Sequence, residues 1–254
     1  MKSTSAPENA TLKLIGVNKN FGGVTAADSI CLELFPGEVV GLIGPNGAGK
    51  TTLLNLITGI YMPDKGTVIL NDKNISRYPT YKRARAGIAR TFQHPRLLDR
   101  CDVRTNVYMG SDLANKCKKT TGNVGEQLDY LMELAGLGQT RLDDTIDKLS
   151  YGQQKILEII RAILCEPCVL LLDEPAAGLN NKEIGYVGAL IQYAVEKNIG
   201  VLLIEHAMDF VMSICDRITV LNFGHQITTG TPKEVQENDE VIKAYLGGGK
   251  HAGR

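Results

Sequence analysis

A glycine-rich loop between an apolar run and a helical pattern is the feature that most constrains this chain. Residues 44–51 read GPNGAGKT and fit the pattern G-x-x-x-x-G-K-[ST]. The apolar run Val39–Ile43 is typical of a strand buried on both faces, and Thr51–Ile57 predicts a helix that ends at Gly59. Such a loop between a strand and a helix forms a cradle for phosphate groups. The sequence therefore predicts an α/β domain that binds a nucleoside triphosphate.

Each residue type in this loop has a physical role. Glycines let backbone N–H groups turn inward around phosphates, and the helix N-terminus adds its positive dipole end. The Lys50 ammonium neutralises the outer phosphates, and the Thr51 hydroxyl is a hard oxygen ligand that suits Mg²⁺. We expect ATP and Mg²⁺ as the cofactors. The predicted nucleotide-binding residues of the loop are Gly44, Pro45, Asn46, Gly47, Ala48, Gly49, Lys50, Thr51 and Thr52.

Two adjacent carboxylates follow the apolar run Val169–Leu172. Asp173 and Glu174 would normally repel each other and raise each other's pKa, but a magnesium ion beside Asp173 removes that objection. We predict that Asp173 holds the metal through water, and that Glu174 orients and deprotonates the water that attacks the γ-phosphate. The alternative is that the two charges merely cap a strand, and a phosphate loop in the same chain disfavours it.

Two further polar residues are candidates because of their positions. His206 follows the predicted strand Val201–Ile204 and can hydrogen-bond the γ-phosphate. Gln93 joins the α/β core to a helical region, and its side chain can ligate Mg²⁺ and move with that region. Either residue alone would more often be structural, so the prediction depends on the ordered set.

Composition argues against some partners. Lys+Arg and Asp+Glu both number 28, so the formal net charge is zero and we expect no nucleic-acid partner. Residues Met1–Ala10 lack the apolar core of a signal peptide, and no apolar run approaches the roughly 20 residues of a spanning helix. We expect a soluble protein that needs separate membrane subunits for any work on a membrane.

The six cysteines are expected to be reduced and packed. Cys165 and Cys168 form a CxxC, which would also suit zinc or redox chemistry. This alternative is disfavoured because a second ligand pair is missing and the spacing contains Glu166-Pro167 just before a strand.

Strand and helix patterns alternate along most of the chain, which implies a mainly parallel sheet. The predicted strands are Thr11–Val17, Ser29–Leu34, Val39–Ile43, Val169–Leu172, Val201–Ile204, Ile218–Asn222 and Gln226–Thr229. Beyond the helix after the phosphate loop, the predicted helices are Gln127–Ala135, Gln153–Leu164, Glu183–Glu196, Met208–Ile214 and one after Thr231. Residues 94–148 show helical spacing without strand signals and predict an inserted helical subdomain. Its middle, Lys116–Gly125, is polar and predicts a loop whose lysines face solvent.

The string LSYGQQ at residues 149–154 identifies the family. With the phosphate loop, Gln93, Asp173-Glu174 and His206 in this order, it resembles the signature set of ABC ATPases from about Leu12 to Leu246. The resemblance implies an ABC-type P-loop NTPase with a RecA-like, mainly parallel sheet core, an antiparallel β subdomain and an inserted helical subdomain. The implied boundaries are 11–247 for the single domain, 11–93 and 156–247 for the core, about 94–155 for the helical subdomain, and 1–10 and 248–254 for flexible tails.

The resemblance also implies a composite site. Ser150 caps the helix predicted from Gln153, and a helix N-terminus suits an anion. In the family, Ser150, Gly152 and Gln153 would contact the γ-phosphate held by the opposite subunit, so that two chains sandwich two ATP molecules head to tail. Phe21 matches the aromatic residue that stacks on adenine, although it would also fit an ordinary core position.

Two departures from the common pattern point to one branch. Tyr151 stands where the commonest signature has glycine, and Asn180 replaces the usual aspartate of the next loop. Both strings look like those of ATPases from branched-chain amino acid importers, as do GIARTFQ at 87–93 and IKAYLG at 242–247. Urea or amide importers and the lipopolysaccharide-export ATPase carry similar strings and remain alternatives.

The function predicted from this resemblance is the ATP-hydrolysing subunit of an ABC importer, taking up branched-chain or other amino acids. Its expected partners are a second ABC ATPase in a head-to-tail dimer, two membrane permeases and, indirectly, a substrate-binding protein. The expected location is the cytoplasmic face of the cytoplasmic membrane. A soluble ABC ATPase of DNA repair or ribosomes is disfavoured, because the chain lacks long coiled coils and a second ATPase unit. A simple P-loop kinase would leave residues 149–154 without a role, and intact Lys50, Glu174 and His206 argue against a degenerate nucleotide-binding regulator.

Overall fold

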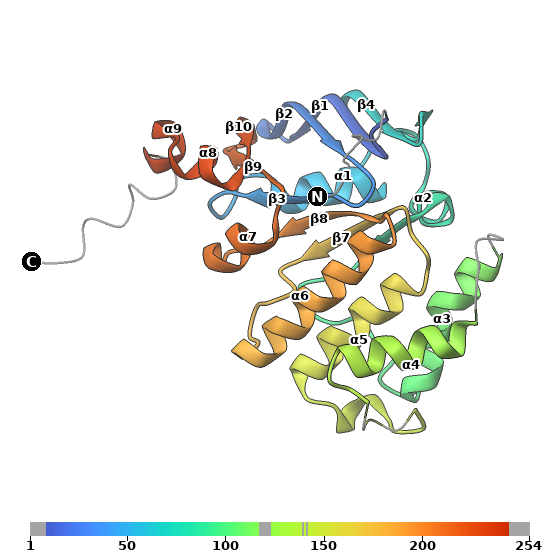
Figure 1. Ribbon diagram of the computed structural model, residues 1–254. Coiled ribbons are helices and arrows are strands. Elements are labelled where there is room, and N and C mark those ends of the chain that lie inside the picture. The colour runs from blue at the N-terminus through green and yellow to red at the C-terminus, as the bar shows by residue number, and fades with distance from the viewer. Residues whose placement is uncertain (1–8, 117–122, 139, 141, 244–254) are drawn as a thin grey trace, which may run out of the picture.

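A single curved sheet organises the computed structural model, which describes residues 9–116, 123–138, 140 and 142–243 (Figure 1). The strand order within this described part is β5-β4-β1-β2-β10-β9-β3-β8-β7-β6. The strands are β1 (Leu12–Phe21), β2 (Val24–Leu34), β3 (Val39–Ile43), β4 (Lys65–Leu70), β5 (Lys73–Asn74), β6 (Ile88–Arg90), β7 (Val169–Asp173), β8 (Gly200–Ile204), β9 (Arg217–Asn222) and β10 (His225–Gly230).

The sheet has a parallel part and an antiparallel part. Strands β9, β3, β8, β7 and β6 pair in parallel, whereas β2, β1, β4 and β5 pair antiparallel. The two parts join at β2 and β10, where His225 pairs with Asp28. This arrangement confirms the predicted α/β class with a mainly parallel core beside antiparallel strands.

Helices surround the parallel strands on both faces. They are α1 (Lys50–Thr58), α2 (Thr80–Ala86), α3 (Val103–Lys116), α4 (Val124–Leu134), α5 (Tyr151–Ile163), α6 (Asn181–Glu196), α7 (Met208–Ile214), α8 (Pro232–Gln236) and α9 (Asp239–Val241), with a short 3₁₀ turn at Ile146–Lys148. In Figure 1, α1 lies between the parallel and antiparallel strands, and α5 and α6 lie on the opposite side. Among the described residues, none of these helices combines the length and apolarity that crossing a membrane requires.

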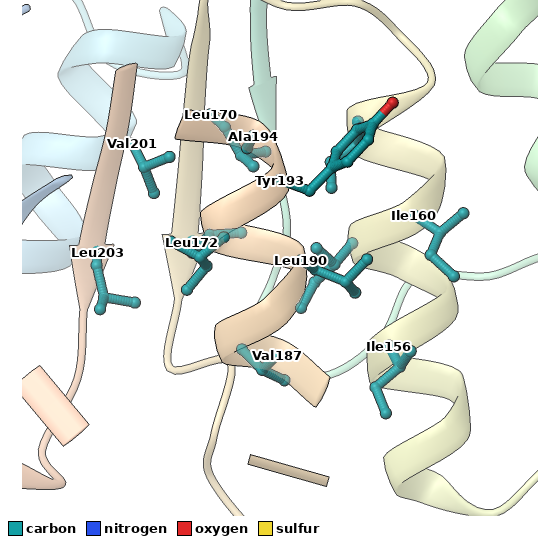
Figure 2. Packing of buried hydrophobic residues seen from close by; sticks show 14 of the residues in the cluster. Ile156, Ile160, Leu170, Leu172, Val187, Leu190, Tyr193, Ala194, Val201 and Leu203 are labelled. Carbon is teal, nitrogen blue, oxygen red and sulfur yellow. The ribbon is translucent and has the colours of Figure 1, made fainter. Parts of the chain in front are cut away.

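Two hydrophobic cores follow from the alternation of side chains along the central strands. On β7, Leu170 and Leu172 pack with α5 and α6, while Val169 and Leu171 pack with α1 on the other face. Figure 2 shows the first of these cores, where β7 and β8 face α6 and α5. Strands β3, β7 and β8 are buried at every position, as their continuous apolar runs predict.

Most predicted elements are present, with shifted ends. Strand β1 extends four residues beyond the predicted end at Val17. The prediction that α5 begins at Gln153 is wrong: it begins at Tyr151, because Ser150 and Gln153 form a capping box that places Gln153 at the third helical position. Position 155, where the helical subdomain was expected to end, lies inside this helix. The segments β4, β5, α2, β6, α3 and α9 were not individually predicted.

Some predictions fall partly outside the described residues. Of the polar loop expected at 116–125, Lys116 ends α3 and Val124 begins α4, while 117–122 lie outside the described part. The same holds for tail residues 1–8 and 248–254, and for 244–247 of the string at 242–247.

The end of α1 is held by a buried guanidinium. Arg83 of α2 is fully buried and donates to the carbonyls of Leu56 (2.5 Å) and Ile57 (2.9 Å). It also donates to the carbonyls of Tyr78 (2.9 Å) and Ser76 (2.8 Å). Burial lowers the pKa of Arg83 to about 10. Because the last carbonyls of a helix lack intrahelical partners, Arg83 fixes the end of the helix that begins at the phosphate loop.

We predict that Arg83→Met lowers the free energy of unfolding by about 3 kcal/mol, because three buried hydrogen bonds and a partly buried one are lost. Urea unfolding with linear extrapolation measures this loss. The matched control is Arg85→Met on the exposed side of the same helix, which should change stability by less than about 0.5 kcal/mol. Equal effects of the two substitutions would contradict the capping role.

Candidate active site

The glycine-rich loop joins β3 to α1, as predicted. Gly49 is the residue before α1 and has a φ of 102°, a left-handed conformation that favours glycine. A Cβ atom on Gly49 would overlap the Ala26 carbonyl of β2, and one on Gly44 would overlap the Leu221 carbonyl of β9. These two glycines are therefore required by the neighbouring strands as well as by the loop.

Lys50 lies inside the loop that it follows. Its side chain donates to the carbonyls of Gly44 (2.7 Å) and Pro45 (3.1 Å), and the residue is 7% exposed. Burial lowers the pKa of Lys50, while the carboxylates of Glu174 and Asp173 act in the opposite direction. Lys50 of the loop and the two carboxylates at the end of β7 are therefore close enough to interact electrostatically.

The remaining loop residues differ in exposure. Ala48 is buried and accepts a hydrogen bond from the Gly224 amide at 3.0 Å. Thr51 is exposed in the first turn of α1, and Thr52 is half-buried. The loop also presents Asn46 and Gly47 to solvent. The hydroxyl predicted as a metal ligand is thus accessible at the helix N-terminus.

The Glu174 side chain, just after β7, contacts residues that follow two neighbouring strands, β6 and β8. Its Oε2 atom accepts from Gln93 Nε2 at 2.8 Å, and its Oε1 atom lies 3.1 Å from His206 Nε2. Its amide donates to the Ile204 carbonyl at 2.9 Å. The residue has a φ of 50°, which is unusual for a side chain of this size and typical of functional positions. The structure therefore brings together the three polar residues that the sequence predicted, each just beyond β6, β7 or β8.

Asp173 forms an ion pair that the sequence analysis missed. Its Oδ2 atom lies 2.8 Å from Arg90 NH2, and both side chains are less than 10% exposed. The other end of the Arg90 guanidinium donates to Asn55 Oδ1 of α1 at 2.7 Å. Arg90 lies in the string GIARTFQ and ends β6, the strand next to β7. The sequence signal that could have indicated this ion pair was a basic residue at a strand end, three positions before Gln93.

Two buried charges shape the loop after Glu174. Lys155 of α5 is 3% exposed and donates to the carbonyls of Glu174 (2.6 Å) and Ala177 (3.0 Å). Glu205 is 2% exposed and accepts from the amides of Ala176 (2.5 Å) and His206 (3.0 Å). The sequence did not reveal these roles, because both charges act on main-chain atoms that only the fold brings near.

The donor set fits a magnesium ion held jointly by protein and nucleotide. Thr51, Gln93 and Asp173 supply hard oxygen atoms, which Mg²⁺ prefers, and the ion pair of Asp173 with Arg90 uses its Oδ2 atom. Within the described part of the chain, no group of three His, Cys, Asp or Glu residues could hold a metal by itself. Mg²⁺ commonly keeps few protein ligands and completes its shell with phosphate oxygens and water.

The helix of the LSYGQQ string begins with a complete capping box. Ser150 Oγ accepts from the Gln153 amide at 3.2 Å, and the Ser150 amide donates to Gln153 Oε1 at 2.9 Å. A Cβ on Gly152 would overlap the Glu183 carboxylate of α6, so this carboxylate would have to move to admit a larger residue. Among the described residues, no hydrogen bond joins Ser150, Gly152 or Gln153 to the phosphate loop. Their predicted contact with a phosphate across two chains therefore stays a prediction.

Phe21 lies at the end of β1 and is 40% exposed. Its ring packs edge-on against Tyr61, with the centroids 5.0 Å apart, and Lys19 Nζ lies 5.4 Å from its centroid. An exposed aromatic ring is available for stacking on a base, and this role stays a prediction.

Comparisons with known proteins show which families the chain resembles. The family model described as ABC transporter matches residues 27–177, and one described as branched-chain amino acid ATP-binding cassette transporter matches residues 225–251. The high-affinity branched-chain amino acid transport ATP-binding protein LivG of Escherichia coli K12 is 41% identical over 249 residues, which cover 93% of this chain and 97% of LivG. BraF of Pseudomonas aeruginosa, which has the same description, is 39% identical over 249 residues, which cover 93% of this chain and 97% of BraF.

Solved structures show the same fold. The ATP-binding cassette MJ1267 of an ABC transporter, in its ADP conformation, superposes with a TM-score of 0.81 at 30% identity and covers 94% of this chain and 99% of its own. A nucleotide-free ATP-binding cassette from an ABC transporter superposes with a TM-score of 0.79 at 29% identity, over 93% of this chain and 99% of its own.

We predict that Arg90 and Asp173 are energetically coupled in the nucleotide-free protein. Arg90→Met should cost about 3 kcal/mol of unfolding free energy, because a buried carboxylate loses its cation. The double variant with Asp173→Asn should be more stable than the sum of the single effects predicts, by about 1 kcal/mol or more. Urea unfolding of the four proteins in a chelating buffer measures the cycle.

The control for this cycle is the exposed pair Arg104 and Asp143, whose coupling should stay below about 0.5 kcal/mol. If the effects of Arg90→Met and Asp173→Asn on the free energy of unfolding are strictly additive, the ion pair contributes nothing to stability.

Proposed function

Since the chain belongs to the ABC transporter family, whose model matches more than half of it, we propose that it hydrolyses ATP at Glu174 to power an importer of branched-chain amino acids. The observation that carries this proposal is the position of the Glu174 carboxylate, held between Gln93 and His206 at the strand ends. The strand ends lie beside the buried Lys50 of the phosphate loop.

Binding begins at the loop of residues 44–51. Its backbone N–H groups and the N-terminus of α1 surround the β- and γ-phosphates of ATP, and Lys50 supplies a compact positive charge. Lys50 then exchanges its loop carbonyl partners for phosphate oxygens. Phe21 provides a platform for the adenine ring.

Thr51, Gln93 and Asp173 would hold Mg²⁺, which would supply positive charge beside the phosphate groups. Arg90 orients the Asp173 carboxylate through the ion pair at 2.8 Å. Its second contact, to Asn55 of α1, ties the acidic strand end to the helix of the phosphate loop.

Glu174 acts as the general base toward the attacking water. Gln93 and His206 each contact one of its carboxylate oxygens, so they fix the carboxylate plane without a covalent role of their own. Lys155 and Glu205 fix the backbone of the following loop from both sides. His206 is also placed to hydrogen-bond the γ-phosphate once a nucleotide is present.

The working unit is a head-to-tail pair of ATPases. Ser150, Gly152 and Gln153 at the start of α5 complete the site of the opposite subunit, which holds its own γ-phosphate. ATP favours the closed pair and ADP does not, so hydrolysis reopens it. We propose that the pair docks on two permeases at the cytoplasmic face of the membrane and that a substrate-binding protein delivers the cargo.

The cargo follows from the relatives. LivG and BraF are described as high-affinity branched-chain amino acid transport proteins, and the family model at residues 225–251 carries the same cargo in its description. The match at residues 225–251 covers a part of the chain outside the ATP-hydrolysing motifs, so it supports the cargo independently of them.

We predict that Glu174→Gln keeps ATP affinity within about three-fold of the wild type and lowers kcat by at least about 100-fold, since the amide cannot take the proton of water. Phosphate release and equilibrium binding of ATP measure the two effects. The control Glu126→Gln on α4 should hydrolyse ATP at the wild-type rate. Wild-type turnover in Glu174→Gln would refute the assignment of the base.

A second experiment tests the transport role. Tagged Glu174→Gln is purified from its native membranes with ATP and Mg²⁺, and the accompanying proteins are identified. We expect two permeases and a second ATPase, and the isolated complex should bind a branched-chain amino acid through its binding protein. Export-type partners would overturn the import proposal, and the absence of any membrane protein from a preparation that retains ATP would overturn the transport role.

A further inference from the structure

Helix α5 contacts the two catalytic loops through one polar stripe. Tyr151, Lys155 and Glu158 are four and three residues apart, so they lie on one face of the helix. Each of them bonds to main-chain atoms of a loop that carries a predicted site residue. The function proposed above uses Lys155 but gives no role to Tyr151, although tyrosine replaces the commonest residue of this motif.

Tyr151 reaches the Gln93 loop directly. Its hydroxyl donates to the Gln93 carbonyl at 3.1 Å, across 58 residues of sequence. A phenol hydroxyl is protonated at neutral pH, so it is a donor there. The ring lies against Gly178 of the loop after β7, where a Cβ would be 3.4 Å from the ring. One side chain therefore contacts both loops that meet at the Glu174 carboxylate.

The neighbouring residues of the stripe hold other points of the same loops. Glu158 accepts from the amides of Phe92 (3.3 Å) and Arg96 (3.0 Å), on either side of Gln93. Lys155 holds the loop after Glu174, and its ammonium lies 5.5 Å from the centre of the Tyr151 ring. Glu158 thus anchors the base of the Gln93 loop, and Tyr151 is the contact of α5 with Gln93 itself.

The first turn of α5 is also where, in the proposed function, the helix N-terminus contacts the phosphate bound by the opposite subunit. Ser150 is the cap and Tyr151 is the first helical residue, so a shift of the helix start moves the tyrosine directly. Glycine at position 151 would have no side chain to transmit that shift. We propose that Tyr151 is a positioning residue that couples nucleotide contact at the start of α5 to the alignment of Gln93 with Glu174 in the same chain.

This inference rests on the proposed function, because it requires ATP at both sites of a two-subunit sandwich. Coupling of this kind is reciprocal in binding, so nucleotide at either site favours productive geometry at the other. Hydrolysis should then depend cooperatively on ATP, and the tyrosine hydroxyl should contribute to that cooperativity.

The experiment compares wild type, Tyr151→Phe and Tyr151→Gly with the control Tyr130→Phe, which removes a hydroxyl from exposed Tyr130 on α4. Hydrogen exchange of the nucleotide-free full-length chain reports the contact. In Tyr151→Phe, the Phe92 and Arg96 amides should exchange about five-fold faster, because the loop opens more often without its hydroxyl anchor. Amides of β3 should exchange as in the wild type.

ATP hydrolysis by the complete transporter reports the consequence. We expect Tyr151→Phe to lower kcat about five-fold and to move the Hill coefficient toward one, while KM for ATP changes less than about two-fold. Tyr151→Gly should lose at least as much cooperativity, and Tyr130→Phe should match the wild type in both measurements.

Three outcomes would overturn the inference. Unchanged exchange in Tyr151→Phe would show that the hydroxyl does not hold the loop. Faster exchange with an unchanged Hill coefficient would leave Tyr151 a structural residue without a coupling role. A wild-type transporter that hydrolyses no ATP would overturn the proposed function and therefore also the coupling. Hydrogen exchange does not depend on hydrolysis, so it tests the contact of Tyr151 with the Gln93 loop separately.

Discussion

The buried ammonium of Lys50 is the interaction on which the rest of the site depends. A cation that is 7% exposed requires polar partners, and the loop carbonyls of Gly44 and Pro45 meet this need. Burial lowers the pKa of Lys50, and the negative charges of Glu174 and Asp173 act against this effect. A phosphate oxygen would be a stronger partner for Lys50 than a carbonyl, which is why we propose that the loop binds an outer phosphate.

Parallel strands explain how distant residues reach this cation. The carboxyl ends of parallel strands lie at one edge of a sheet, and ligands bind in open α/β sheets at this edge. Strands β3, β6, β7 and β8 end there, and the chain places its phosphate loop, Gln93, Glu174 and His206 just beyond them. Helix α5 contacts the loops after β6 and β7 through Tyr151, Lys155 and Glu158. In the function that we propose, strand order sets the catalytic geometry, and α5 adjusts it and carries the contact surface for a second subunit.

Local patterns predicted most of this fold, and their failures have physical reasons. The phosphate loop and the apolar strands β3, β7 and β8 have signals contained within the segment itself. Strands β5 and β6 have two and three residues, too few for a periodic pattern. The early start of α5 was readable from Ser150 and Gln153, whose spacing fits a capping box. The ion pair of Arg90 joins residues 83 positions apart, and the contacts of Lys155 and Glu205 are with backbone atoms, so no local pattern reports them.

The most direct test of this account is calorimetric titration of Lys50→Ala with ATP and Mg²⁺, beside wild type and the control Lys73→Ala on the exposed strand β5. A charge-assisted contact to phosphate predicts a loss of at least about ten-fold in affinity for Lys50→Ala and none for the control. Circular dichroism would verify that the variant remains folded. Unchanged ATP affinity in folded Lys50→Ala would contradict the assignment of the glycine-rich loop as the phosphate site.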